Sequence, residues 1–201
     1  MPKLYYTPPS GHSYKVRLLL SFLDISYESV IIDLSKGEQK TEEYLKINPL
    51  GQVPVWQDGS VTIHDSQAIL VYLAQQHQNT AWTLPNDAES LAKIMQWLSV
   101  AANEITHGPT AIRFYWRKQP STVNLKLATT RAQAILTLLN DHLASRLWLE
   151  LERPTIADIA CFPYIFLLED EDWFSLQDYP HVRAWIARFK ALPRFIPLLV
   201  S

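Results

Sequence analysis

NPLGQVPV at residues 48–55, followed by DSQAI at residues 65–69, says most about how this chain folds. A proline in a β-forming segment donates no hydrogen bond to a strand ladder, so Pro54 marks an edge, a turn or a bulge. If the peptide bond before Pro54 is cis, the backbone of Val53 faces outward and can pair with an extended ligand. Asp65 and Ser66 then open an apolar helix whose free N–H groups suit a carboxylate. Together the two stretches predict a clamp for a short peptide that ends in an acidic group.

The composition is that of a well-buried soluble globule. The 201 residues (23.1 kDa) are 48% hydrophobic and 19% charged, which allows one domain or two small ones. A net charge of −2 and a pI near 6.3 give no sign of a nucleic-acid partner. The initial MPKLYY shows no signal-peptide pattern, and no apolar run approaches the roughly 18 residues of a membrane helix. We therefore expect a cytoplasmic protein without membrane contact.

Cysteine and histidine usage argues against several chemistries. Cys161 is the only cysteine, so the chain can form neither an internal disulfide nor a Cys-x-x-Cys redox centre. The six histidines show no His-x-x-x-His spacing, so we expect no metal site.

The first third of the chain predicts a βαβ–ββα module. A strand is expected at Lys3–Tyr6, a helix through Val16 to Leu23, and a second strand at Tyr27–Asp33 that lies parallel to the first. Residues 36–45 indicate a polar loop or an irregular helix. Strands at 53–57 and 61–64 flank the Asp-Gly turn at 58–59, and a helix follows at 66–76.

Beyond residue 78 the pattern becomes helical. We expect helices from Ala88 to about residue 118, from 122 to 147 after a Pro-Ser start signal at 120–121, and from 181 to 192. Another helix is expected to begin at Thr155, where Asp158 three residues later gives a variant of the capping box. The predicted fold is therefore an α/β domain at 1–78, a linker at 79–85 and an all-α domain at 86–201.

Motifs in both halves resemble one family in their order and spacing. They are Tyr5-Tyr6 before a serine-containing turn, Gly37 to Lys40, Asn48 to Pro54, Asp65 to Ile69, Pro154 to Ala160, and Tyr179 to Val182 leading to Trp185. With them the chain resembles cytosolic glutathione S-transferases over nearly its whole length. The resemblance implies a thioredoxin-like N-terminal domain, a helical C-terminal domain, a homodimer and glutathione as co-substrate.

The residue that activates the glutathione thiol is expected in the first turn. Ser10 stands six residues before Val16, where serine- and cysteine-type classes carry their active residue, so we expect a serine-type or divergent bacterial class such as the cyanobacterial chi class. Tyr6, Ser13 and a backbone amide remain as alternatives. Lowering a thiol pKa from about 8.5 by about 2 units takes roughly 2.7 kcal/mol. A helix N-terminus gives about 0.3–1 kcal/mol and a hydrogen bond to a charged acceptor about 1.5–3 kcal/mol, so the two together suffice.

The clamp residues divide between the two ends of glutathione. The main chain of Val53, before Pro54, is expected to pair with the cysteinyl unit. Asp65 and Ser66 are expected to hold the ammonium and carboxylate of the γ-glutamyl end. The candidates for the glycyl end are Gln39, Lys40 and Gln52.

An electrophile pocket is expected from the first long helix. Its candidates are His107, Phe114 and Tyr115, with Arg113, Trp116 and Arg117 nearby; His12 is a further candidate from the first turn. The predicted function is conjugation of glutathione to small hydrophobic electrophiles. A non-catalytic ligand- or protein-binding module and a family isomerase, dehalogenase or peroxidase are the alternatives. The absence of a cysteine near residue 10 argues against a glutathione-dependent disulfide reductase.

Overall fold

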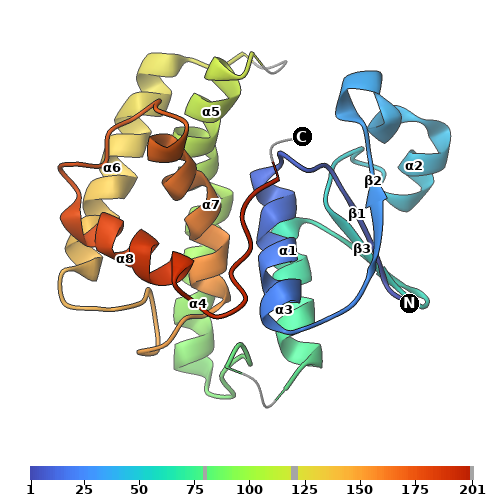
Figure 1. Ribbon diagram of the computed structural model, residues 1–201, viewed down its shortest axis with the longest axis horizontal. Helices are drawn as coiled ribbons and strands as arrows, with labels where there is room; N and C mark the ends of the chain where they lie inside the picture. The colour runs from blue at the N-terminus through green and yellow to red at the C-terminus, as the bar shows by residue number, and fades with distance from the viewer. Residues whose placement is uncertain (79–80, 119–121, 200–201) are drawn as a thin grey trace. The chain divides into compact units, whose positions relative to one another are not determined.

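The computed structural model describes residues 1–78, 81–118 and 122–199. The chain divides into two compact units, one of Met1–Thr80 with Pro193–Ser201 and one of Ala81–Leu192 (Figure 1). The C-terminal segment thus belongs with the first unit, whereas the sequence analysis placed it in the helical domain. None of the helices in the described ranges is long and apolar enough to cross a bilayer.

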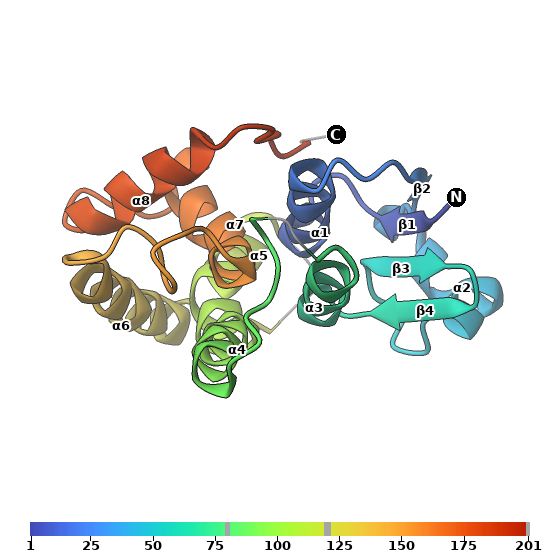
Figure 2. The same cartoon turned by 90° about the horizontal axis from the view of Figure 1, so that it is seen from below.

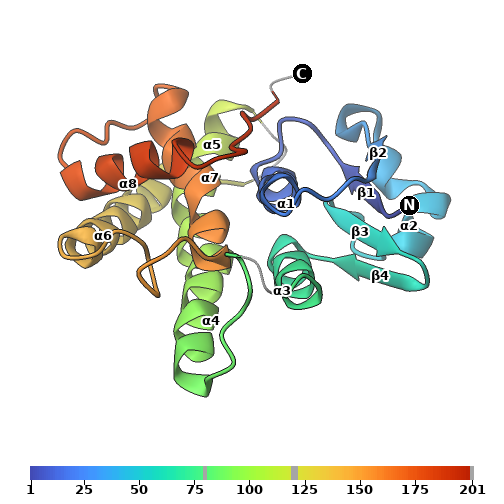
Figure 3. The same cartoon turned by 60° about the horizontal axis from the view of Figure 1, so that its bottom comes forward.

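A mixed four-stranded sheet organises the first unit. It contains β1 (Lys3–Tyr6), β2 (Glu28–Ile31), β3 (Val55–Asp58) and β4 (Val61–His64) in the order β2-β1-β3-β4. β1 and β2 are parallel, as expected for a crossover through a helix, and the other two pairings are antiparallel. Helices α1 (Gly11–Phe22) and α3 (Ser66–Gln76) lie on one face of the sheet and α2 (Glu42–Ile47) lies on the other (Figures 2 and 3).

The apolar faces of α1 and α3 form the core against the sheet. Val16, Leu19 and Leu20 of α1 are buried, as are Ile69, Leu70 and Leu73 of α3. Spacings of three and four residues place them on one side of each helix, so the predicted periodicity identified the buried faces. The first α/β unit therefore has the predicted βαβ–ββα order.

Two strands are shorter than expected. β2 ends at Ile31, because Asp33 begins a separate turn whose N–H groups are capped by its own carboxylate. β3 starts at Val55 rather than residue 53, since Pro54 has no N–H to offer the ladder. The segment between β2 and β3, expected as a loop or an irregular helix, forms two short 3₁₀ turns, η1 (Leu34–Lys36) and η2 (Glu38–Lys40), before α2.

The second unit is helical, as predicted. Its elements are α4 (Ala88–Ala102), η3 (Thr106–Thr110), α5 (Ala111–Trp116), α6 (Leu125–Leu143), α7 (Ile156–Asp170) and α8 (Pro180–Lys190). The expected continuous helix from 88 to about 118 is wrong, because the chain leaves α4 at Asn103 and makes the π turn η3. Pro109 lies inside this turn and has no N–H for an α-helical hydrogen bond.

The ends of the later helices are set by capping groups. α6 begins at Leu125 and not at residue 122, because the side chain of Asn124 accepts the N–H of Leu127 at 3.1 Å. The Pro-Ser signal at 120–121 lies outside the described residues. The capping box expected before α7 is confirmed: Thr155 accepts the N–H of Ala157, and Asp158 accepts the N–H of Thr155 at 2.8 Å.

Candidate functional site

One end of the sheet collects the segments that the sequence analysis singled out. Tyr6, the last residue of β1, pairs with Ile31, the last residue of β2. Tyr5 pairs with Val55 at the start of β3, and Val55 pairs with His64 at the end of β4. The turn after β1, the loop after β2, the corner before β3 and the start of α3 therefore emerge together. This register brings residues 10–13, 33–40, 52–54 and 65–66 to the same end of the first unit.

The corner before β3 presents a peptide whose hydrogen-bonding groups are free among the described residues. The Val53–Pro54 bond is cis, which is the condition that the sequence analysis set for pairing of Val53 with a ligand. The carbonyl oxygen of Gln52 accepts hydrogen bonds from the Tyr44 hydroxyl and the Asn48 side-chain amide, both at 2.8 Å. These two donors fix the plane of the Gln52–Val53 peptide. Within the described residues, neither the N–H nor the carbonyl of Val53 is hydrogen-bonded, so both can pair with an extended ligand.

Tyr44 and Asn48 were not predicted to support this corner. Both are buried, with exposed fractions of 4% and 1%. Burial raises the pKa of the Tyr44 phenol well above its ordinary value, so its hydroxyl remains a donor at neutral pH. Asn48 belongs to the NPLG motif. Its position four residues before Gln52 was the sequence signal for this contact.

The start of α3 is formed by Asp65 in an unusual backbone conformation. Its φ of 74° is left-handed, which is rare for a non-glycine residue and clusters at functional sites. One carboxylate oxygen, Oδ1, accepts the N–H groups of Gln67 at 2.9 Å and Ala68 at 3.1 Å. No described group binds the other oxygen, Oδ2, and Asp65 is exposed. Asp65 therefore caps the helix with one oxygen, and its other oxygen has no partner among the described residues.

Ser66 is buried directly behind this cap. It is 2% exposed, and its hydroxyl donates to the Oε1 atom of Gln67 at 2.5 Å. The backbone N–H of Ser66 has no partner among the described residues and lies in the first turn of α3. Such a group at a helix start favours a carboxylate.

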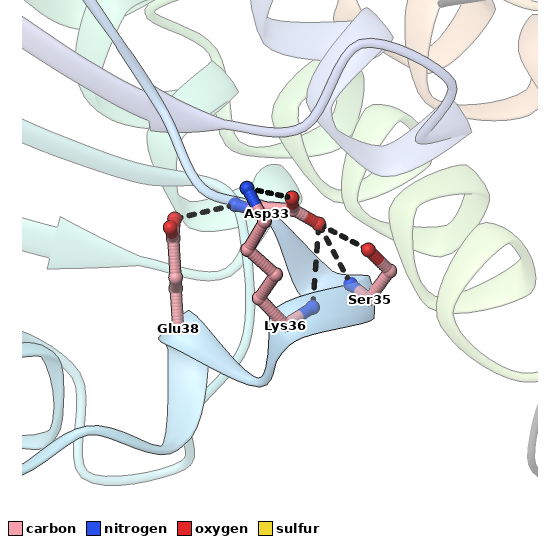
Figure 4. A network of polar contacts seen from close by, with 4 residues as sticks. All are labelled: Asp33, Ser35, Lys36 and Glu38. Atoms are coloured by element: carbon pink, nitrogen blue, oxygen red, sulfur yellow. Dashed lines mark hydrogen bonds and ion pairs between the residues drawn. The ribbon is translucent and has the colours of Figure 1, made fainter.

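The loop after β2 is braced by a polar network before it reaches the corner (Figure 4). The Asp33 carboxylate accepts the Ser35 hydroxyl at 2.6 Å and the Lys36 ammonium at 3.1 Å. These contacts lower the pKa of Asp33 to about 2. Glu38 in turn accepts the N–H of Asp33 at 2.7 Å, and Gly37 turns the chain with a left-handed φ of 74°. The ionised carboxylate of Asp33 and the hydrogen bonds around it thus hold the loop in one arrangement.

This loop places Gln39 and Lys40 beside Gly51. A Cβ on Gly51 would lie 2.7 Å from the carbonyl oxygen of Gln39 and 2.7 Å from Nζ of Lys40, so only glycine fits there. Nζ of Lys40 also donates to the carbonyl of Leu50 at 3.3 Å. The Oε1 atom of Gln39 is buried and has no hydrogen-bond partner among the described residues. Gln39 and Lys40 therefore lie beside Gly51, the neighbour of Gln52, which is the third candidate for the glycyl end.

Ser10 is the N-cap of α1. Its hydroxyl oxygen accepts the N–H of Ser13 at 3.2 Å, and its carbonyl accepts the N–H of Tyr14 at 2.8 Å. The hydroxyl proton of Ser10 is donated to no group in the described parts of the chain, and the residue is half-buried. Ser13 is fully buried, so its hydroxyl is not accessible to a ligand. Tyr6 is 5% exposed, with the Arg17 guanidinium carbon 5.6 Å from its ring centre.

Comparison with known proteins identifies the family of this chain. The sequence pattern of the glutathione S-transferase N-terminal domain matches residues 2–75, and that of the glutathione S-transferase C-terminal domain matches residues 101–188. The chain belongs to the glutathione S-transferase family. The predicted fold class, a thioredoxin-like domain followed by an all-helical domain, is thereby confirmed.

Three known proteins illustrate the range of the family. Glutathione S-transferase 2 of Schizosaccharomyces pombe is 30% identical to this transferase, covering 94% of this chain and 91% of that protein. The Escherichia coli protein named disulfide-bond oxidoreductase YfcG is also 30% identical, covering 96% and 92%. A glutathione transferase homolog from Drosophila mojavensis, solved with bound glutathione, has a TM-score of 0.86 at 25% identity and covers 96% and 88% of the two chains.

The electrophile-pocket candidates of the transferase lie on two elements of the second unit and one of the first. His107 is exposed in η3, and Phe114 and Tyr115 lie in α5, half-buried and 45% exposed. The Tyr115 ring meets the Trp116 ring edge-on at 5.4 Å. His12 is half-buried in the first turn of α1. Their role in electrophile binding stays a prediction.

The two arginines near these aromatics are engaged elsewhere. Arg113 is 2% exposed and forms a bidentate pair with Glu171, with N–O distances of 2.9 and 3.0 Å. Arg117 approaches the same carboxylate at 3.5 Å. These charges link α5 to the end of α7, so we assign them a structural role. Among the described residues, no group of three or more histidine, cysteine, aspartate or glutamate side chains is arranged to hold a metal ion.

Proposed function

We propose that the protein conjugates glutathione to small hydrophobic electrophiles, with Ser10 stabilising the glutathione thiolate. One observation supports this most strongly. The strand register gathers the free Val53 peptide, the open oxygen of Asp65 and the unshared hydroxyl proton of Ser10 at one end of a single sheet. A bound glutathione needs three groups: a partner for its main chain, an acceptor for its ammonium group and a hydrogen-bond donor to its thiolate.

The chemistry of Ser10 follows from its hydrogen bonding. Because its oxygen already accepts the N–H of Ser13, the side chain is oriented, and its proton remains available to a thiolate. A hydrogen bond to a charged acceptor contributes about 1.5–3 kcal/mol. The N-terminus of α1 adds about 0.3–1 kcal/mol. The sum matches the roughly 2.7 kcal/mol that lowers a thiol pKa by about 2 units.

The remaining residues hold the tripeptide. The N–H and carbonyl of Val53, before Pro54, pair with the cysteinyl unit. Oδ2 of Asp65 accepts the γ-glutamyl ammonium, while the N–H of Ser66 binds the neighbouring carboxylate. The glycyl carboxylate is held by groups beside Gly51: Gln39, Lys40 and Gln52.

Glutathione-dependent disulfide reduction is the second candidate, because the relative YfcG is named for it. In this chain Cys161 is the only cysteine, and it is fully buried in α7. The protein therefore offers no accessible thiol of its own, and any such activity would use the thiols of glutathione alone. The conjugation reaction needs no protein thiol, so we favour it.

Ser10→Ala provides the decisive test. We expect it to raise the pKa of the bound glutathione thiol by about one unit and to lower turnover with an aryl halide by about tenfold. Ser13→Ala, at a fully buried position, should change both quantities little. An unchanged thiol pKa in Ser10→Ala would refute the role of Ser10 and leave Tyr6 and the backbone amides of the first turn as candidates. A wild type that binds no glutathione at millimolar concentration would refute the proposed function itself.

The family also supports a homodimer in the cytoplasm. Light scattering on the purified protein tests the homodimer directly, because a dimer of the 23.1 kDa chain doubles the measured mass.

A further inference from the structure

The C-terminal segment runs along α1 within the first unit. Its described residues are 193–199, drawn in dark red beside the blue helix in Figure 1. The carbonyl of Arg194 accepts the hydroxyl of Ser21 at 2.8 Å, and the carbonyl of Ile196 accepts the hydroxyl of Tyr14 at 2.6 Å. The segment therefore passes from the last turn of α1 to its first turn, antiparallel to the helix.

The end of this segment that lies away from Ser10 is anchored by an ion pair. The guanidinium of Arg194 forms a two-pronged contact with the carboxylate of Asp24, with Nη2 and Oδ2 at 2.8 Å. Such a fork-to-carboxylate pair fixes orientation as well as position. Asp24 follows directly after the end of α1, so the anchor sets where the segment begins its path along the helix.

The other end of the segment, at Ile196, reaches the first turn of α1, which follows Ser10. Tyr14 is fully buried, and its side chain projects from the first turn of α1 to the Ile196 carbonyl. The backbone N–H of Tyr14 donates to the carbonyl of Ser10 at 2.8 Å, while the preceding N–H, that of Ser13, donates to the Ser10 side chain. One residue thus joins the C-terminal segment to the cap of α1.

We propose that residues 193–199 act as a strap that positions Ser10, and that Tyr14 is the positioning residue through which the strap acts. The proposal rests on the proposed role of Ser10 toward glutathione. A hydroxyl that stabilises a thiolate must be held within about 0.5 Å of its productive place. The Ile196 carbonyl holds the Tyr14 side chain, and so the first turn of α1 is held from a part of the chain 182 residues away.

Tyr14→Phe in the full-length protein tests the strap, because it keeps the ring and removes the hydroxyl. We expect the pKa of the bound glutathione thiol to rise by about half a unit or more and kcat near neutral pH to fall about threefold or more. The KM for glutathione should stay within about twofold, since the binding groups at Val53 and Asp65 are untouched. A variant that was merely less stable would keep the thiol pKa of the wild type.

Tyr5→Phe is the matched control. It removes another tyrosine hydrogen bond of the same unit, to Gln57 at 3.2 Å, without touching the strap. Its thiol pKa and kcat should equal those of the wild type. Arg194→Gln, at an exposed anchor, provides a second variant that folds even if Tyr14→Phe does not, and it should shift the thiol pKa in the same direction by a smaller amount.

The outcomes separate the strap from the proposed function. If the wild type lowers the thiol pKa of glutathione but Tyr14→Phe and Arg194→Gln have the same thiol pKa as the wild type, the strap is refuted, and the role of Ser10 is decided by Ser10→Ala alone. A shift in Tyr5→Phe as large as that in Tyr14→Phe would also refute the strap. If the wild type holds no thiolate at all, both proposals fail.

Discussion

At the scale of single residues, one substitution can separate the capping role of Asp65 from its proposed role toward glutathione. Asp65→Asn keeps an oxygen for the N–H groups of Gln67 and Ala68 but removes the charge facing a ligand ammonium. We expect glutathione to bind about tenfold or more weakly by calorimetry, with little change in stability. Asp65→Ala also loses the cap, so its unfolding free energy should fall by about 1 kcal/mol as well. Equal affinity of Asp65→Asn and wild type would remove Asp65 from the ligand site.

The sequence could predict that several candidate site residues lie close together, because they stand near strand ends. Val53 was expected at the start of a strand and lies two residues before β3, while Asp65 and Ser66 follow β4, and strand register brings such positions together. Tyr44 and Asn48 were missed as supports of the Gln52 carbonyl, because that contact depends on how α2 returns to the corner. The full burial of Ser13 was equally hidden, since a serine in a first turn gives no sign of which way it faces.

At the scale of elements, Gly108 decides how closely η3 and α6 pack. A Cβ there would lie 2.9 Å from the backbone N of Ala132 and 3.1 Å from the carbonyl carbon of Arg131, and neither atom can move alone. Gly to Ala inside a helix normally stabilises by about 0.5–1 kcal/mol. Here we expect Gly108→Ala to destabilise by about 1–3 kcal/mol, measured by urea unfolding. A urea midpoint of Gly108→Ala equal to or higher than that of the wild type would show that η3 and α6 can move apart to admit the methyl group.

The same elements show why helix existence is easier to predict than helix continuity. The apolar periodicity of residues 88–118 is genuine, since Ile94, Trp97 and Ile112 are all buried. This periodicity did not predict the π turn, because the turn inserts an extra residue and shifts the buried helix face without ending the apolar pattern. Pro109 was the available signal, because a helix interior loses one hydrogen bond at proline.

At the scale of the whole molecule, the path of the C-terminal segment was beyond sequence reasoning. Residues 193–199 have no helical or strand periodicity, and their place depends on side chains far away in sequence, at Tyr14, Ser21 and Asp24. A domain boundary predicted from composition divides the chain into consecutive segments. Here the C-terminal segment returns to the first unit after the helical unit.

The stability of the molecule should also depend on pH through one buried group. Asp158 is fully buried and accepts four hydrogen bonds, from the N–H and hydroxyl of Thr155, the N–H of Leu149 and the indole N–H of Trp185, yet burial dominates and raises its pKa to about 6. In the unfolded chain its pKa is about 3.9. The folded state therefore binds more protons between these values, so the stabilisation is complete below about pH 4 and is lost as the pH rises through about 6.

Urea unfolding of Asp158→Asn and wild type from pH 4 to 8 measures this dependence. We expect the stability advantage of the wild type over Asp158→Asn to shrink by up to about 3 kcal/mol between roughly pH 4 and 6 and to stay constant above pH 7. Asp87→Asn gives the matched contrast: hydrogen bonds from Ser90 lower the pKa of this exposed cap, so its contribution is instead lost as the pH falls. A pH-independent difference between wild type and Asp158→Asn would mean that the four donors around Asp158 outweigh its burial and keep the carboxylate ionised.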